Sequence, residues 1–418
     1  MKTLRSRKFM AVVCILTAMA MLLVGCGAGK TKNAAATEAA STGEDTVKVI
    51  VCYSLSGAQA NGGQFALDGV KFAADYINSN GGIASLGGAK IELAVYDATS
   101  DADQVKTVME KAIEENPDAV AALCGSTSGL TLPAIPVCEK AEIPLLAFTN
   151  SAQLTDQGYK YIFSFTPQAP DVGQAQVDFL NWLNTEKGYD YTKVAIIYED
   201  SSNGLATAEG YRNTATNLGL EIVYDEPFAS GLADASSIVT GVINSGAHVV
   251  FFSGYDNDNK LVVENMNSMN YHPLWLGSVS WFSFGESLGD ACNGFIANGN
   301  WNYRNSTVVN NPEYLEITNK FEEAYGYVMT EQSGSSFIGL QLVKDALEIT
   351  GKADSVAVRN ALAENTFNSM MQPGTVTFNE AGINIDAKAG VQQWQNGECV
   401  CIYPEDLAST DYIDPSDF

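Results

Sequence analysis

The feature that most constrains the fold is an alternation of short apolar runs with helical segments, clearest between residues 119 and 155. Apolar runs at 119–123 and 143–148 flank a segment at 130–141 that has helical spacing. Runs of this length alternating with helices predict βαβ units in a parallel sheet. Because such crossovers are right-handed, the loops after both runs lie at the same edge of the sheet, where open α/β sheets bind ligands.

These two loops are rich in hydroxyl groups and carry no cation. The first reads Ser126-Thr127-Ser128-Gly129 and the second Thr149-Asn150-Ser151, and no Lys or Arg lies between Gly125 and Glu139. A helix N-terminus beside hydroxyl groups supplies N–H and O–H donors. The edge therefore suits a single carboxylate better than a phosphate. The alternative is that Ser128 only caps the helix.

The same alternation continues along the chain in two series. One begins with the strand 47–53, and the other begins near Pro167 and includes strands from 193–198 to 274–276. Two series of strand–helix units predict an α/β fold of two lobes, each a parallel sheet flanked by helices. The tail departs from this alternation, with helices and then short strands expected at 312–325, 335–350, 355–364, 375–378, 391–394 and 399–402.

The N-terminus has the layout of a signal peptide. Four basic residues precede an apolar run that ends in Leu23-Val24-Gly25-Cys26, which resembles a bacterial lipobox. We therefore expect a signal peptide over 1–25, cleavage before Cys26 and a diacylglycerol on its sulfur. An ordinary secretory peptide and an uncleaved anchor are the alternatives. Residues 26–45 lack periodicity and predict a flexible, lipidated tether.

Charge and cysteine content narrow the functional classes further. A net charge of −26 argues against nucleic acid as a partner. No C-x-x-C spacing occurs, so neither a metal site nor any other cofactor is expected. Six cysteines remain after Cys14 and Cys26, and they predict buried thiols or disulfides: Cys52, Cys124, Cys138, Cys292, Cys399 and Cys401.

Catalytic motifs are missing from the sequence. The chain has only two histidines, His248 and His272, and neither lies in a hydrolase or zinc-protease motif. The loops after the strands lack a paired acid and base. We therefore predict that the protein is not an enzyme.

Several short motifs, in order, resemble the type I periplasmic binding proteins, and especially the leucine/isoleucine/valine-binding family of ABC importers. They are Leu55-Ser56-Gly57, Asp68-Gly69, the two hydroxyl loops and Gly374-Thr375-Val376-Thr377-Phe378, within a resemblance that spans 46–404. The resemblance implies three hinge crossovers, near 166–167, 300–303 and 371–374. It places 46–167 and 302–372 in an N-terminal lobe, and 168–301 and 373–418 in a C-terminal lobe.

The resemblance implies an extracytoplasmic lipoprotein, anchored to the bacterial cell membrane by its N-terminal lipid. It would capture a small carboxylate-bearing solute, such as a branched-chain or other apolar amino acid, by hinge closure and deliver it to the transmembrane subunits of an ABC permease. A lipid-anchored ligand sensor with the same fold is an alternative. A binder of a non-amino-acid carboxylate or amide is another.

The family's pattern also implies roles for single residues. Ser128 would donate its hydroxyl and N–H to the ligand carboxylate, and Thr149 would offer its backbone carbonyl to an ammonium. Ser151 could serve both groups. Tyr255, after a strand of the second lobe, matches a tyrosine that reaches across the cleft, although it could also be a surface residue.

The sequence departs from the family where amino-acid binders place an acidic residue against the ammonium. Val279 or Ser280 stands there. Because a buried ammonium without a carboxylate partner is unfavourable, the ligand could instead lack an ammonium. Asp256 or Glu199 could substitute, but the sequence does not place either.

Two aromatic positions of the family's cleft are also changed. Asn203 stands at one of them and Gly62 at another. Trp281 could stack on the ligand or pack between the lobes.

Overall fold

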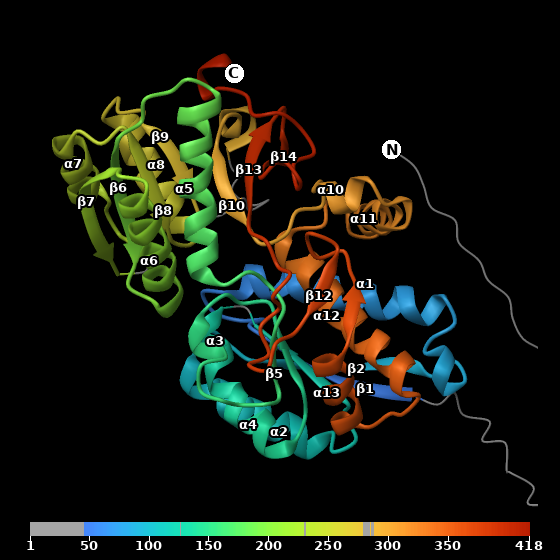
Figure 1. Ribbon diagram of the computed structural model, residues 1–418. Helices are drawn as coiled ribbons and strands as arrows, with labels where there is room; N and C mark the ends of the chain where they lie inside the picture. The colour runs from blue at the N-terminus through green and yellow to red at the C-terminus, as the bar shows by residue number, and fades with distance from the viewer. Residues whose placement is uncertain (1–45, 126, 230, 279–284, 286–287) are drawn as a thin grey trace, which may run out of the picture. The chain divides into compact units, whose positions relative to one another are not determined.

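The computed structural model describes residues 46–418 except 126, 230, 279–284 and 286–287, so the predicted signal peptide and the tether with Cys26 lie outside it. The first sheet has five parallel strands in the order β2-β1-β3-β4-β5. Figure 1 labels β1, β2 and β5 of this sheet. Their bounds are β1 Thr46–Tyr53, β2 Lys90–Asp97, β3 Ala121–Cys124, β4 Leu145–Ala147 and β5 Ile162–Ser164.

Helices cover both faces of this sheet. They are α1 Ala60–Ser79, α2 Ala102–Glu115, α3 Ser128–Thr131, α4 Ile135–Ala141, α11 Pro312–Tyr325, α12 Glu331–Thr350 and α13 Ser355–Glu364. Alternate residues of β1 point to opposite faces, so Val49 and Val51 pack with α1 and α12 while Ile50 and Cys52 pack with α2 and α4. A strand buried on both faces must be apolar throughout, as the run at 47–53 predicted.

The second sheet has seven strands in the order β14-β13-β10-β9-β8-β6-β7. Their bounds are β6 Lys193–Glu199, β7 Glu221–Phe228, β8 Val249–Ser253, β9 Leu274–Gly277, β10 Ile296–Gly299, β13 Gly390–Gln395 and β14 Glu398–Tyr403. The predicted parallel pairing holds for β6 to β10. Helices α5 Ala169–Glu186 and α6 Ser202–Asn217 pack on one face, and α7 Ser236–Ser245 and α8 Asp256–Ser268 on the other.

The edge of this sheet differs from a purely parallel arrangement. Strand β13 runs antiparallel to both β10 and β14. Asn396 and Gly397 connect β13 to β14 with φ values of 54° and 83°. Positive φ at both positions is typical of a two-residue hairpin turn, which can only join antiparallel strands.

The third passage between the sheets lies later in the chain than expected. Strands β11 Thr366–Asn368 and β12 Thr375–Thr377 form a small antiparallel sheet, and Val376 and Phe378 belong to the core of the first sheet. The Asn384 N–H then donates to the Ser164 carbonyl at 2.9 Å. The chain therefore crosses between 384 and 390, not at 371–374, because residues 375–378 bury apolar side chains in the first core.

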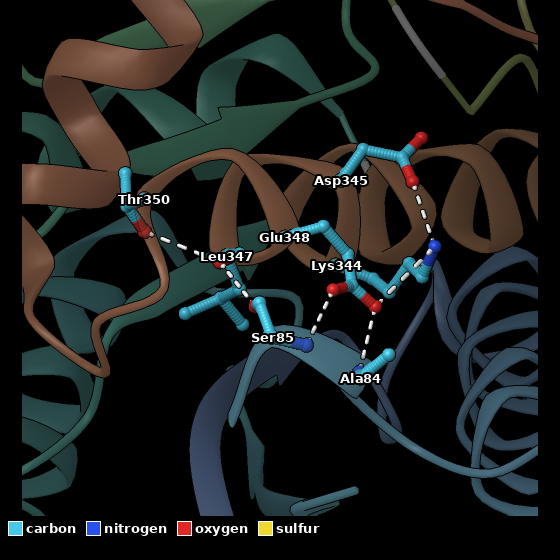
Figure 2. A network of polar contacts seen from close by, with 7 residues as sticks. All are labelled: Ala84, Ser85, Lys344, Asp345, Leu347, Glu348 and Thr350. Carbon is cyan, nitrogen blue, oxygen red and sulfur yellow. Dashed lines mark hydrogen bonds and ion pairs between the residues drawn. The ribbon is translucent and has the colours of Figure 1, made fainter. Parts of the chain in front are cut away.

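Helix α12 is fixed to an early loop of the chain by one carboxylate (Figure 2). Glu348 accepts the backbone N–H groups of Ala84 and Ser85, each at 2.8 Å, and its carboxylate lies 3.8 Å from Lys344 Nζ. Burial by itself raises the pKa of Glu348, but the hydrogen bonds from Ser85 and Ala84 outweigh it, and the pKa is lowered. The contact joins segments more than 260 residues apart, which helps to place α12 beside α1.

The six cysteines outside the first 45 residues are all buried. Within the described part of the chain, no helix combines the length and apolar character needed to cross a membrane.

Candidate ligand-binding site

The strand ends of both sheets contribute to one pocket. From the first sheet it is lined by residues after β3 and β4, and from the second by residues after β6, β8 and β9 and within β10. The first residues of α12 complete it. The lining residues are Thr127, Ser128, Phe148, Thr149, Asn150, Val172, Glu199, Asn203, Thr207, Ser253, Gly254, Tyr255, Ser278, Asn298, Asn300, Glu331 and Gln332.

Ser128 lines the pocket and is not the helix cap. The cap of α3 is Thr127, whose hydroxyl accepts the Leu130 N–H at 3.4 Å. The Ser128 hydroxyl instead accepts the backbone N–H of Ser151 at 3.3 Å, which joins the two hydroxyl loops. The Ser128 hydroxyl group thus keeps its own proton available for donation to a ligand oxygen.

The two predicted residues of the second hydroxyl loop have different surroundings. Thr149 lines the pocket, and its carbonyl accepts the Ser164 hydroxyl at 3.1 Å while retaining a second lone pair. Ser151 is buried, its hydroxyl accepts the Gln153 N–H at 3.3 Å, and it is not among the lining residues described. Ser151 contacts the lining through its backbone N–H bond to the Ser128 hydroxyl.

On the second sheet, Glu199 and Tyr255 face the pocket together. Glu199 ends β6, is fully buried, and accepts the Ser201 hydroxyl at 2.5 Å. Burial raises the pKa of Tyr255, the charge of Glu199 raises it further, and a hydrogen bond with Thr127 opposes both effects. Tyr255 thus interacts with side chains from both sheets.

Asn203 also lines the pocket, from the first turn of α6. The remaining predicted residues are not placed there. Gly62 is not among the described lining residues. Val279, Ser280 and Trp281 lie outside the described residues.

A chain of hydrogen bonds on the opposite side of the pocket was not predicted. Glu331, at the start of α12, accepts the backbone N–H of Asn300 at 2.9 Å and its Nδ2 at 2.7 Å. Asn150 Nδ2 donates to Asn300 Oδ1 at 2.6 Å, and the Thr166 hydroxyl donates to Asn150 at 3.3 Å. Burial raises the pKa of Glu331 to about 7, although the Asn300 donors act in the opposite direction. The chain of hydrogen bonds thus runs from Thr166 through Asn150 and Asn300 to this carboxyl group and links two passages between the sheets.

The ionisable side chains that line the pocket are all acidic among the described lining residues, apart from the phenol of Tyr255. The described lining includes two carboxyl groups, Glu199 and Glu331, and no Lys, Arg or His. Buried carboxylates favour a positively charged neighbour. Glu199 thus places a buried carboxyl group in the pocket lining, at a position that the sequence left open.

A family model described as "Periplasmic binding protein" matches residues 46–398. The chain belongs to this family. The match covers the first sheet and the second sheet as far as the first residue of β14, and it confirms the resemblance found in the motifs.

Similar members of the periplasmic binding protein family are known from Brucella. Leu/Ile/Val-binding protein homolog 7 of Brucella abortus is 28% identical over 376 residues, which cover 87% of this chain and 92% of the relative. Leu/Ile/Val-binding protein homolog 8 of Brucella suis is 29% identical over 403 residues, which cover 93% of this chain and 98% of the relative. Both are named as binding proteins, in agreement with the prediction that this chain is not an enzyme.

Solved structures share the fold at low sequence identity. The branched-chain amino acid transporter substrate binding protein LivJ of Streptococcus pneumoniae, in complex with isoleucine, has a TM-score of 0.75 at 21% identity and covers 86% of this chain and 100% of its own. A second structure is a solute binding protein of an ABC transporter from Rhodopseudomonas palustris in complex with 3,4-dihydroxybenzoic acid. It has a TM-score of 0.71 at 18% identity, and the match covers 87% of this chain and 95% of that protein. The predicted α/β fold class is confirmed.

Proposed function

We propose that this protein is the substrate-binding component of an ABC importer and that its solute is an α-amino acid. The observation that carries the proposal is that Glu199 faces the same pocket as Ser128 and the Thr149 carbonyl. An α-amino acid brings a carboxylate and an ammonium on one carbon, and this pocket offers hydroxyl and N–H donors for the first and acidic or carbonyl acceptors for the second.

In the proposed complex, the solute carboxylate accepts hydrogen bonds from the Ser128 hydroxyl and backbone N–H. Its ammonium lies between Glu199 and the Thr149 carbonyl, which removes the need for an acidic residue at Val279 or Ser280. Tyr255, already in contact with groups of both sheets, covers the solute. Ser151 acts through Ser128. The polar Asn203 takes part in the lining.

Capture follows from differential affinity. Each sheet with its helices forms one lobe, and the three passages of the chain between the sheets form the hinge. The solute gains its full set of contacts only when both lobes touch it, so binding shifts the population toward a closed form. The transmembrane subunits of the permease recognise that form and accept the solute.

The capture of an amino acid is tested by calorimetric titration of the purified chain beginning at Gly27. The panel is the set of L-amino acids, and each one that binds is compared with its deaminated acid and its amide. We expect at least one amino acid to bind and its deaminated acid to bind far more weakly, because Glu199 then lacks a cation. Binding confined to the deaminated acids or amides would contradict the proposal.

Glu199→Gln keeps the size of the side chain and removes its charge. We expect this change to weaken amino-acid binding about thirtyfold, or about 2 kcal/mol, because a charge-assisted hydrogen bond to the ammonium is lost. Glu209→Gln is the matched control, since Glu209 is exposed on α6, the helix that follows β6, and is not a described lining residue. Equal affinities of the two variants would remove Glu199 from the site.

We also propose that Cys26 carries the lipid that holds the protein on the outer side of the cell membrane. The lipobox-like Leu23-Val24-Gly25-Cys26 and the basic residues before it support this proposal. We expect Cys26→Ser to move the protein from the membrane fraction to the soluble extracytoplasmic fraction, with Cys14→Ser as the control that stays in the membrane. Membrane retention of the Cys26→Ser protein would show that the anchor lies elsewhere.

A further inference from the structure

Three neighbouring strands of the second sheet place polar residues in one row at the edge that faces the pocket. They are Ser253 at the end of β8, Ser278 just after β9 and Asn298 in β10. The strand register supports the row. Phe251 pairs with Leu276 and Gly277 pairs with Ala297, and Ser253, Ser278 and Asn298 each follow one of these residues by one or two positions. All three line the pocket.

Two of these three side chains have unused hydrogen-bonding capacity. Ser278 accepts the Gly254 N–H at 2.8 Å and donates to the Gly254 carbonyl at 2.6 Å, so its hydroxyl is occupied. Ser253 Oγ and Asn298 Nδ2 have no hydrogen-bond partner within the described part of the chain, although only 1% and 5% of these residues is exposed. Buried polar groups are nearly always paired, so a pair of unpaired ones on a pocket wall indicates that a ligand supplies the partner.

We infer that Ser253 and Asn298 bind the side chain of the solute and that this side chain ends in a neutral oxygen-containing group, an amide or a hydroxyl. The inference rests on the proposed function and narrows its solute class. It departs from the branched aliphatic amino acids named for the Brucella relatives.

The hydrogen-bonding groups of Ser253 and Asn298 favour some solute side chains over others. Asn298 Nδ2 is a donor, so the ligand atom that faces it must be an acceptor, which excludes an ammonium or guanidinium at this position. A side-chain carboxylate is disfavoured because Glu199 and Glu331 line the same pocket. A branched aliphatic chain would fill the space and leave both polar atoms buried without partners, which is the situation that proteins discriminate against most strongly.

The remaining lining is consistent with a polar side chain. Among the described lining residues, Val172 and Phe148 have side chains made only of hydrocarbon. Asn203, Thr207 and Gln332 present amide or hydroxyl groups. A pocket for an aliphatic side chain is expected to be lined mainly by apolar residues.

The test uses pairs of amino acids that differ in polarity but hardly in shape. L-asparagine is titrated against L-leucine and L-threonine against L-valine, with L-glutamine added for length, on the purified chain beginning at Gly27. In at least one of these comparisons, we expect the polar amino acid to bind at least tenfold more tightly than its aliphatic partner. L-glutamine is compared with L-leucine in the same way. Preference for leucine, isoleucine or valine would overturn the inference and leave the proposed function standing.

The role of Asn298 is tested by Asn298→Leu, which has nearly the same shape and no donor. We expect it to weaken the binding of the preferred polar amino acid at least tenfold and to reduce or reverse the preference over its aliphatic partner. Asn213→Leu, at an exposed position of α6, is the control that leaves both affinities unchanged. If Asn298→Leu does not fold, Ser253→Ala takes its place, with the same loss of preference expected.

The outcomes separate the two proposals. An unchanged polar preference in a folded Asn298→Leu or Ser253→Ala protein overturns the assignment of these residues. Binding confined to lysine or arginine overturns it as well, because Glu331 would then be the partner of the side chain. If no amino acid binds at all, the proposed function fails and this inference falls with it.

Discussion

Gly69→Ala is expected to destabilise the protein by about 3 kcal/mol, because it forces a methyl group into a close backbone contact between α1 and α12. A Cβ added at Gly69 would lie 2.1 Å from the carbonyl oxygen of Ser333 and 2.5 Å from its Cα. These are backbone atoms, so no side-chain rotation relieves the clash and the two helices must separate. The free energy of unfolding from urea titration measures the effect.

Gly62→Ala is the matched control in the same helix. A Cβ at Gly62 would meet no atom within 4 Å. Since alanine favours the helix over glycine, this change is expected to stabilise the protein by about 0.5–1 kcal/mol. If the two variants had equal stability, helix propensity alone would account for both, and the tight crossing of α1 and α12 would not contribute.

Two helices with clear local signals were predicted to the residue, whereas α12 begins at Glu331, four residues before the helix expected at 335–350. The helices expected at 312–325 and 355–364 are α11 and α13, with the same bounds. Asn311 caps α11 by accepting the Glu313 N–H at 3.0 Å, and Gly326 ends it with a φ of 77°. Such caps depend on neighbours in sequence, so they can be recognised without knowledge of the fold.

Elements fixed by distant partners were missed. Strand β10 reads Ile-Ala-Asn-Gly, which has no strand-like pattern, yet it pairs with both β9 and β13. Strand β5 has three residues and joins the sheet through β4. In both cases the pairing partner decides the structure of the segment, which a local pattern cannot reveal.

The residues of the candidate site also fall into those that local patterns predicted and those that long-range contacts determine. Ser128, Thr149, Asn203 and Tyr255 lie near the ends of predicted strands, and the topology brings all four to the pocket. Asn298, Asn300 and Glu331 lie in or after β10 and at the start of α12, where only long-range contacts determine which residues face the solute. The predicted role of Ser151 in direct binding stays a prediction, and its backbone N–H bond to the Ser128 hydroxyl is a long-range contact that no sequence pattern reveals.

The stability of the protein is expected to fall by about 2 kcal/mol between about pH 5 and 8 through Glu331 alone. Burial raises the pKa of this carboxyl group from 4.5 to about 7 in the folded protein. In this interval the folded state binds more protons than the unfolded state, so unfolding becomes easier as the pH rises. The stabilisation from the bound proton is complete below about pH 4.5 and is lost as the pH rises through about 7.

Glu331→Gln removes the titration while preserving the shape of the side chain. The unfolding free energy of the variant minus that of the original protein should therefore rise by about 2 kcal/mol from about pH 5 to 8, since the other ionisable groups cancel in the difference. Glu348→Gln is the control, because the pKa of Glu348 is lowered and its titration lies below this interval. A flat difference for Glu331→Gln would mean that the carboxyl group stays charged in the folded protein. In that case the bonds from Asn300 outweigh burial, and the junction of the two passages holds a permanent negative charge beside the solute.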